Sequence, residues 1–299
     1  MVRALVITVL LILNLSLWGT LVFLGGLPKL LTTGRARRRV ILLMAWFAER
    51  WVQGNDHIFD LLLDTRWQSS GLDELRRDGR CLLISNHVSW VDIFALFRAV
   101  RGRGPFIRFF MKRILLWFPI AGQGCWALEF PFMRRYTPEY LAKHPEKRGV
   151  DLETTRIACE RYRDLPVTVA NFIEGTRYTR SKHARQNSPY RFLLRPRVGG
   201  IGFMLASFSQ HLDAVYDVTL IYPDHDVNLW QFLTNRLEWV RVEARRIDVP
   251  AEFHTAAITQ PGAARERFKA WVDVLWREKD AQIARALGQE DLPPEALAG

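Results

Sequence analysis

One uncharged apolar run near the N-terminus limits the folds open to this chain more than any other feature. No charged side chain occurs between Ala4 and Pro28, and leucine, isoleucine and valine dominate the run. As an α-helix rising about 1.5 Å per residue, it is long enough to cross the ~30 Å hydrocarbon core of a bilayer. A cleaved signal peptide has a shorter apolar region and a small-residue cleavage site. We therefore expect residues 1–30 to be retained as a transmembrane or membrane-embedded anchor.

Basic residues are distributed unevenly around this run. Lys29 and four arginines at positions 35–39 follow it, whereas only Arg3 precedes it. By the positive-inside rule, this asymmetry predicts that the rest of the chain faces the cytoplasm. Two adjacent glycines and Pro28 near the end of the run leave a second arrangement open, a re-entrant or interfacial helix.

The remaining chain predicts a single large domain. Its 299 residues are 49% hydrophobic, enough to bury a substantial core. We expect amphipathic membrane-proximal helices over 31–70, the main domain over 71–290 and a flexible tail over 291–299. The three cysteines lack Cys-x-x-Cys spacing and predict neither a disulfide framework nor a metal site. A net charge of +11 implies an acidic partner, and the apolar run favours an anionic membrane over nucleic acid.

Short β-rich runs alternate with helical segments through the main domain. Strands are predicted at 81–85, 105–110, 126–132, 167–172, 214–222 and 239–247, and helices near 90–100, 111–118, 150–163, 200–210 and 262–287. This alternation indicates an α/β fold with a mostly parallel sheet flanked by helices.

The strongest local signal is a polar turn after the apolar run 81–84. It holds His87, and no other histidine of the seven has an aspartate five positions later, as His87 has in Asp92. A strand followed by a turn and a helix is where α/β sheets bind ligands. An aspartate in the first helical turn can accept a hydrogen bond from the imidazole and raise its basicity. The pair predicts a general base for an alcohol; the alternative is a helix-capping Asp92 and an ordinary loop histidine.

A second turn follows the apolar run 167–170 and ends in Glu-Gly-Thr-Arg at 174–177. Gly175 lets the backbone approach a ligand closely, Thr176 supplies a hydroxyl, and Arg177 can bind a phosphate with two hydrogen bonds. These are the parts of an anion site.

Two arginine-rich windows without acidic residues adjoin these turns, one over 93–128 and one over 175–212. Such runs are usually a solvated basic face. Because each lies beside a site-like turn, we interpret them as one positive basin for phosphates.

A third motif, Phe-Pro-Phe-Met-Arg-Arg at 130–135, ends a predicted strand with paired arginines. Alone it is weak, and a structural salt bridge is the alternative to a phosphate clamp.

The order of these motifs, His-x4-Asp, then Phe-x-x-Arg, then Phe-x-Glu-Gly-Thr-Arg, resembles the glycerophospholipid acyltransferase family, which includes 1-acyl-glycerol-3-phosphate acyltransferases. The stretches 194–197 and 212–223 are similar to a branch shared by bacterial inner-membrane acyltransferases and the lysocardiolipin and lysophosphatidylinositol acyltransferases. The resemblance covers roughly residues 80–225, and the three motifs in order make it specific. It implies a glycerol-3-phosphate acyltransferase-like fold at the cell inner membrane, with the catalytic domain facing the cytoplasm.

Carried over by position, the resemblance makes His87 the catalytic base and Asp92 its orienting partner. The substrate-binding residues that it implies are Asn86 and Ser89, which support the first turn, Phe132 and Arg135 of the second motif, and Glu174, Gly175, Thr176 and Arg177 of the third. The acceptor implied is a lysophospholipid, foremost 1-acyl-glycerol-3-phosphate, in phospholipid biosynthesis or remodelling. The donor is acyl-CoA or acyl carrier protein, and no cofactor, metal or covalent enzyme intermediate is required.

Departures from the family pattern include Glu129 where the second motif often has glycine, Ile173 in place of proline, and no proline before Val218. They leave the acceptor head group open, as the sequence does for acyl chain preference, donor carrier and oligomeric state. Two other functions use the same residues. A membrane-tethered lipid hydrolase would deliver the acyl group to water, and a non-catalytic basic lipid-binding protein would not need His87.

Overall fold

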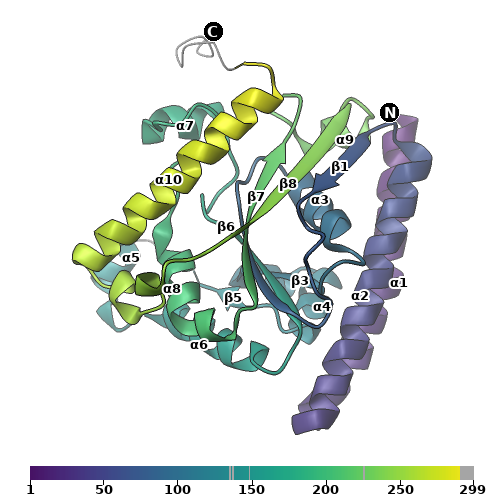
Figure 1. The fold of residues 1–299 in the computed structure, drawn as a ribbon. Coiled ribbons are helices and arrows are strands. Elements are labelled where there is room, and N and C mark those ends of the chain that lie inside the picture. Colours follow the sequence, from purple (N-terminus) through teal and green to yellow (C-terminus); the bar gives the residue numbers. More distant parts are fainter. Residues whose placement is uncertain (135, 137, 148, 225, 290–299) are drawn as a thin grey trace.

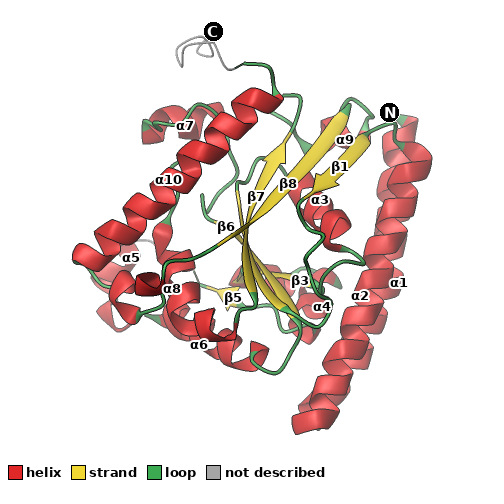
Figure 2. Cartoon of the chain, in the orientation of Figure 1, coloured by secondary structure: helices red, strands yellow, loops and turns green. Residues whose placement is uncertain are grey.

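The structure, a computed structural model, describes residues 1–134, 136, 138–147, 149–224 and 226–289. A central sheet is covered by helices on both faces, and two long N-terminal helices lie along one side (Figures 1 and 2). The expected α/β architecture is therefore confirmed.

The main sheet has six strands in the order β1-β8-β7-β2-β6-β3. They are β1 (Arg66–Ser70), β2 (Arg80–Ser85), β3 (Ile107–Phe109), β6 (Val167–Phe172), β7 (Ala214–Ile221) and β8 (Trp239–Ile247). Strands β7, β2, β6 and β3 are parallel to one another, whereas β8 is antiparallel to β7 and carries β1 parallel to itself. A separate pair, β4 (Met111–Lys112) and β5 (Phe132–Met133), lies beyond β3 in the chain.

Both faces of the sheet are buried. Leu83 packs in a core that includes Ala95 and Leu96, whereas its neighbour Leu82 packs in a second core with Tyr162 and Phe268. Because side chains alternate along a strand, burial of both faces explains the uninterrupted apolar run in β2. The first core is covered by α3 (Val91–Val100) and the N-terminal helices; α6 (Val150–Tyr162), α8 (Val198–Phe208) and α10 (Ala263–Ala286) cover the second. Shorter helices are α4 (Ala121–Ala127), α5 (Pro138–Lys143), α7 (Arg180–Gln186) and α9 (Leu229–Leu233).

The predicted strand over 126–132 is wrong. Residues up to Ala127 continue α4, and a strand begins only at Phe132. Apolar residues occur there because α4 packs on the N-terminal helix: a Cβ on Gly26 would lie 2.6 Å from the Cβ of Ala127. Similarly, the helix predicted near 111–118 consists of β4 followed by the 3-10 helix η2 (Arg113–Trp117).

The N-terminal helices form an antiparallel hairpin (Figure 1), here called the hairpin: α1 (Val2–Gly26), the 3-10 helix η1 (Leu27–Leu30) and α2 (Gly34–Leu62). The segment Val2–Leu30 is long and apolar enough to cross a membrane, with a mean hydropathy of 2.3. Asn14 of α1 donates to the carbonyl of Trp51 and to Oδ1 of Asn55 on α2, both at 2.9 Å. The two helices are therefore joined by polar contacts as well as apolar packing.

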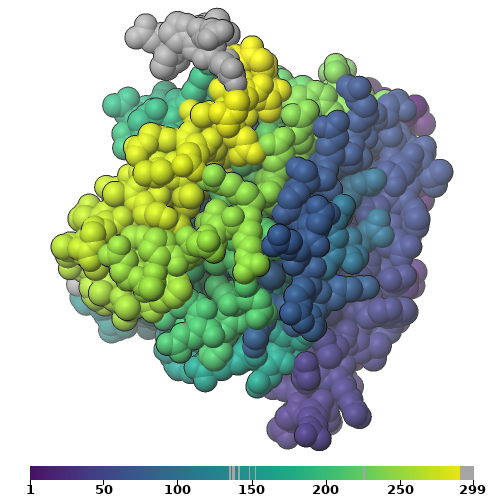
Figure 3. Space-filling view, viewed as in Figure 1, coloured from purple at the N-terminus to yellow at the C-terminus, as the bar shows by residue number. Residues whose placement is uncertain are grey.

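The domain touches both ends of α1. Near the start, Arg3 pairs with Asp64 at 3.5 Å, two residues before β1. Beyond the other end, Lys29 in η1 donates to the carbonyl of Ala127 at 3.2 Å and pairs with Glu129 at 3.3 Å. The hairpin thus lies alongside the domain rather than projecting from it, and Figure 3 shows only one end extending beyond the body.

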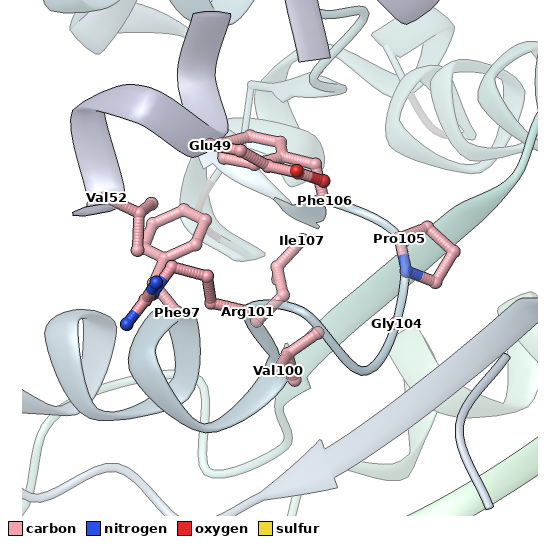
Figure 4. Close-up of a pocket in the computed structure, with 9 residues that line it drawn as sticks. All are labelled: Glu49, Val52, Phe97, Val100, Arg101, Gly104, Pro105, Phe106 and Ile107. Carbon is pink, nitrogen blue, oxygen red and sulfur yellow. The ribbon is translucent and has the colours of Figure 1, made fainter. Parts of the chain in front are cut away.

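The seam between α2 and the domain is closely packed. A pocket between α2 and the α3–β3 connection, lined by Val52, Phe97 and Phe106 among others, has a volume of about 10 Å³ (Figure 4). That volume accommodates at most one water molecule. It is far too small for an acyl chain.

Candidate active site

The turn after β2 brings His87 and Asp92 together. His87 Nδ1 lies 2.7 Å from Asp92 Oδ2, and that oxygen also accepts the backbone N–H groups of Val88 at 2.7 Å and Ser89 at 3.0 Å. Asp92 is in the first turn of α3 and is fully buried. Amides at a helix start favour a carboxylate. Asp92 therefore both closes the turn and holds the imidazole by Nδ1.

Two phenylalanines support the imidazole face. The ring of His87 stacks on Phe172 at 4.0 Å between centroids, and Phe172 stacks on Phe109 at 5.6 Å. Phe172 and Phe109 end the neighbouring strands β6 and β3. The side chain of His87 is 17% exposed. The ring is thus held in one plane with an edge open to solvent.

Asn86 and Ser89 are buried and bond to the protein backbone. Asn86 donates to the carbonyl of Leu220 at 2.9 Å and accepts the N–H of the same residue at 2.8 Å. Ser89 Oγ accepts the N–H of Val91 at 3.3 Å. Asn86 therefore ties the turn to β7, and Ser89 shapes the entry to α3.

The second predicted turn lies beside the first because β6 is the parallel neighbour of β2. The N–H of Ile173 donates to the carbonyl of Ser85 at 3.3 Å, and that of Tyr178 donates to the carbonyl of His87 at 2.7 Å. Residues 174–177 are thereby fixed next to the catalytic turn.

Glu174 points into the protein. It is 1% exposed, and burial, with the nearby Asp92 charge, raises the pKa of its carboxyl well above the ordinary value. Backbone hydrogen bonds from His87 and Leu194 oppose that rise without cancelling it. By accepting the N–H of His87, the carboxyl braces the backbone of the turn.

Gly175 adopts φ +71°, and a Cβ there would lie 3.0 Å from Cδ of Arg197. The left-handed backbone favours glycine, and a Cβ would also press on the side chain of Arg197.

Thr176 and Arg177 form a cationic surface. Lys182 Nζ donates at 2.8 Å to both Thr176 Oγ1 and the carbonyl of Arg177. The guanidinium of Arg177 lies 4.6 Å from the ring centroid of Trp90, in the catalytic turn. Within the described ranges Arg177 makes no ion pair with a carboxylate. Its charge is thus available to an anionic ligand.

The described part of the second motif lies in a separate two-stranded sheet. Phe132 is half-buried in β5, which pairs with β4, and among the described residues no ring contact links it to His87. Arg135 lies outside the described residues. Phe132 therefore belongs to the two-stranded sheet, and it packs against the core that includes Val88 and Phe109.

Sequence reasoning missed the hydrogen bond from the Tyr222 hydroxyl to Asp92 Oδ1. Tyr222 ends a predicted strand and lies in the stretch 212–223 that resembles the family, but neither signal linked it to Asp92.

A buried carboxylate orients an imidazole at the carboxyl edge of a parallel sheet, beside a cation, and this is the arrangement of a general base in an α/β enzyme. The acyltransferase family model matches residues 66–223, just over half of the chain. The chain therefore belongs to this family of acyltransferases, within the glycerophospholipid acyltransferases.

Three similar proteins illustrate the relationship. Lysocardiolipin acyltransferase 1 of Danio rerio is 27% identical over 287 residues, covering 90% of this chain and 68% of that protein. A probable 1-acyl-sn-glycerol-3-phosphate acyltransferase 5 of Arabidopsis thaliana is 28% identical over 221 residues, covering 70% of this chain and 54% of its own length. The crystal structure of the Thermotoga maritima PlsC acyltransferase shares the fold, with a TM-score of 0.52, 15% identity and coverage of 94% and 96%.

Proposed function

We propose that this enzyme transfers a fatty acyl group from a thioester, acyl-CoA or acyl carrier protein, to the free hydroxyl of a lysophospholipid. The acceptor proposed is 1-acyl-glycerol-3-phosphate. The printed names of the relatives, a lysocardiolipin acyltransferase and a 1-acyl-sn-glycerol-3-phosphate acyltransferase, support a lysophospholipid acceptor.

The observation that carries this proposal is the His87–Asp92 pair itself. Asp92 holds Nδ1 at 2.7 Å, so the imidazole carries its proton on that nitrogen and has a lone pair on Nε2. Nε2 takes the proton of the acceptor hydroxyl as its oxygen attacks the thioester carbonyl. When the carbon–sulfur bond breaks, the imidazolium returns the proton to the departing thiolate. No covalent acyl-enzyme is needed.

The cationic surface beside the pair supports a phosphate-bearing acceptor. Arg177 lies against Trp90, three residues from the base, and Lys182 is bonded to its carbonyl. A guanidinium binds a phosphate monoester through two parallel hydrogen bonds. We assign acceptor binding to Arg177 together with Arg135, with Thr176 supporting the loop.

Membrane association accords with the hairpin. Large apolar side chains on α1 are exposed, among them Leu5, Val9, Leu13 and Leu17. Because the domain contacts both ends of α1, we propose that the hairpin lies in one leaflet of the cell inner membrane, with the domain on its cytoplasmic side. This is the interfacial alternative that Gly25 and Gly26 left open.

Acyl transfer by the His87→Ala variant tests the function. Loss of a general base typically lowers the rate about 10²–10⁴-fold, so labelled acyl-CoA and lysophospholipid should yield almost no two-chain product. Asp92→Asn should be similarly severe, through loss of the orienting carboxylate.

The wild-type products distinguish the alternatives. Accumulation of free fatty acid would indicate a hydrolase, and near-normal turnover by a folded His87→Ala protein would disprove the mechanism. The thermal midpoint of each variant serves as the folding control, because the imidazole also stacks on Phe172.

A further inference from the structure

The two oxygens of the Asp92 carboxylate have different partners. Oδ2 accepts hydrogen bonds from Nδ1 of His87 and from the backbone amides of Val88 and Ser89. Oδ1 accepts the hydroxyl of Tyr222, and the described part of the chain offers it no other hydrogen-bond donor. Asp92 is fully buried, so water does not substitute for these partners. One side chain, distant in sequence, thus supplies the last hydrogen bond to the carboxylate.

Sheet topology explains how Tyr222 reaches the site. Strands β2 and β7 are parallel neighbours in which Ser85 is opposite Val218, so both end at the same edge. The side chain of Asn86 then bonds both backbone groups of Leu220, which fixes the end of β7 against the turn. Tyr222, two residues farther on, is 1% exposed. Its hydroxyl is held at Asp92 by the strand ladder and not by a flexible loop.

We propose that Tyr222 is a positioning residue for the base: its hydroxyl sets the rotation of the Asp92 carboxylate and limits how strongly that carboxylate stabilises the imidazolium. The inference rests on the proposed function. Burial and the Asp92 charge raise the pKa of Tyr222 well above its ordinary value, so the hydroxyl keeps its proton and donates throughout the working pH range. The negative charge on Asp92 is thereby partly offset at Oδ1.

Tyr222→Phe removes the donor and leaves a buried carboxylate oxygen without a partner. The carboxylate should then rotate more freely and stabilise the protonated imidazole more strongly. We expect kcat to fall about tenfold, with the Michaelis constants of donor and acceptor unchanged. Protonation of the base should become easier. The acid limb of the kcat/KM profile should therefore move to higher pH by roughly half a unit to one unit.

Tyr216→Phe is the matched control. Tyr216 is on the same strand, is also 1% exposed, and its hydroxyl has no hydrogen-bond partner within the described ranges. At about 3.3 Å per residue it lies roughly 20 Å back along the strand from Tyr222. Removal of the Tyr216 hydroxyl should leave kcat and the pH profile unchanged.

Two further measurements apply if Tyr222→Phe loses stability. Replacing Tyr222 by 3-fluorotyrosine keeps the ring and strengthens the donor, so the acid limb should move to lower pH. In an Asp92→Ala background, Tyr222→Phe should cause no further loss of kcat, because a residue that acts through Asp92 has nothing left to position.

An unshifted pH profile, or equal losses of kcat with and without Asp92, would show that Tyr222 only packs and would overturn the inference. Loss of activity in His87→Ala with an unchanged Tyr222→Phe would reject this inference alone. Retained activity in His87→Ala would instead reject the proposed function.

Discussion

At the scale of single residues, the guanidinium of Arg177 stands out because it stacks on Trp90 and has no carboxylate partner in the described structure. A structural salt bridge was the alternative explanation for the motif arginines. For Arg177 the structure shows a cation left facing the site. A free cation there is consistent with the proposed binding of an anionic acceptor.

Arg177→Ala should raise the Michaelis constant for the lysophospholipid roughly 10–100-fold and that for the acyl donor little, because charge-assisted hydrogen bonds to phosphate are lost. Arg177→Lys should rescue only partly, since an ammonium keeps the charge without the planar pair of donors. The same result is expected for Arg135. Separate titration of the two substrates measures the effect.

Arg156→Ala provides a control, because Arg156 forms exposed ion pairs with Glu153 and Glu160 on α6. It should change neither constant. If the motif arginines are structural, their variants should instead melt at lower temperature and lose activity toward both substrates alike.

Residues that act through local chain geometry were accessible to sequence reasoning, and those that act across the sheet were not. His87 and Asp92 are five positions apart in a strand–turn–helix, so the turn alone brings them together. Tyr222 is 130 positions from Asp92, and no local pattern marks a tyrosine whose hydroxyl meets it. The inward orientation of Glu174 was likewise invisible, since a Glu-Gly-Thr-Arg turn in sequence is equally compatible with an exposed carboxylate.

At the scale of elements, Glu129 joins the hairpin to the catalytic domain. Its buried side chain pairs with Lys29 of η1 at 3.3 Å, Arg37 of α2 at 2.7 Å and Arg161 of α6 at 2.9 Å. The residue has φ +63°, a left-handed backbone that favours glycine, which is often found here in the family. The departure from glycine is therefore compensated by three ion pairs that fasten the hairpin to the domain.

Glu129→Gln should weaken this junction by about 3 kcal/mol, because it leaves the buried Lys29 without its counter-ion. Lower thermal midpoints and faster hydrogen exchange over residues 27–37 are the expected readouts. Glu153→Gln, at an exposed pair with Arg156, is the matched control and should have little effect. Equal behaviour of the two variants would contradict a fastening role for Glu129.

The same junction predicts a pH dependence. Burial alone would raise the pKa of Glu129, but Lys29, Arg37 and Arg161 together hold it below its ordinary value of 4.5. A lowered folded-state pKa contributes stability above the unfolded value, and this contribution disappears as pH falls through the folded value. The stability difference between wild type and Glu129→Gln should thus be constant near neutrality and shrink below about pH 4.5.

Elements with strong periodicity were predicted well, and those defined by tertiary contacts were not. The buried strands β2, β6 and β7 have apolar runs because helices cover both faces. Strand β1 is mostly exposed and has the polar sequence Arg-Trp-Gln-Ser-Ser. It fell within the region predicted to form amphipathic helices, because an exposed edge strand lacks a clear alternating pattern. The last two residues of α4, Trp126 and Ala127, were included in a predicted strand because their apolar side chains pack on the hairpin.

At the scale of the whole molecule, the attachment of α1 at both ends limits its possible orientations in a bilayer. As a helix of 25 residues it is about 38 Å long. Arg3 lies beside Asp64, just before β1, and Lys29 lies beside Glu129, so the same domain contacts both ends. A perpendicular span would draw one of these contacts, with its charged residues, into the opposite leaflet.

We therefore expect the N-terminus and the C-terminus to lie on the same, cytoplasmic, side of the membrane. Epitope tags at each end, probed by protease in sealed vesicles of both orientations, measure this directly. Both tags should be cleaved in inverted vesicles and protected in right-side-out ones if, as proposed, the hairpin lies in one leaflet and the domain faces the cytoplasm. A tag within the domain, for example after Gly288 in the last described segment, controls for vesicle integrity.

If the N-terminal tag alone were cleaved from outside, α1 would span the bilayer and the contact between Arg3 and Asp64 would have to be absent in the membrane. A C-terminus accessible only from outside would separate the catalytic domain from cytoplasmic thioesters, and would contradict both the orientation inferred from the arginine cluster and the proposed acyl donor.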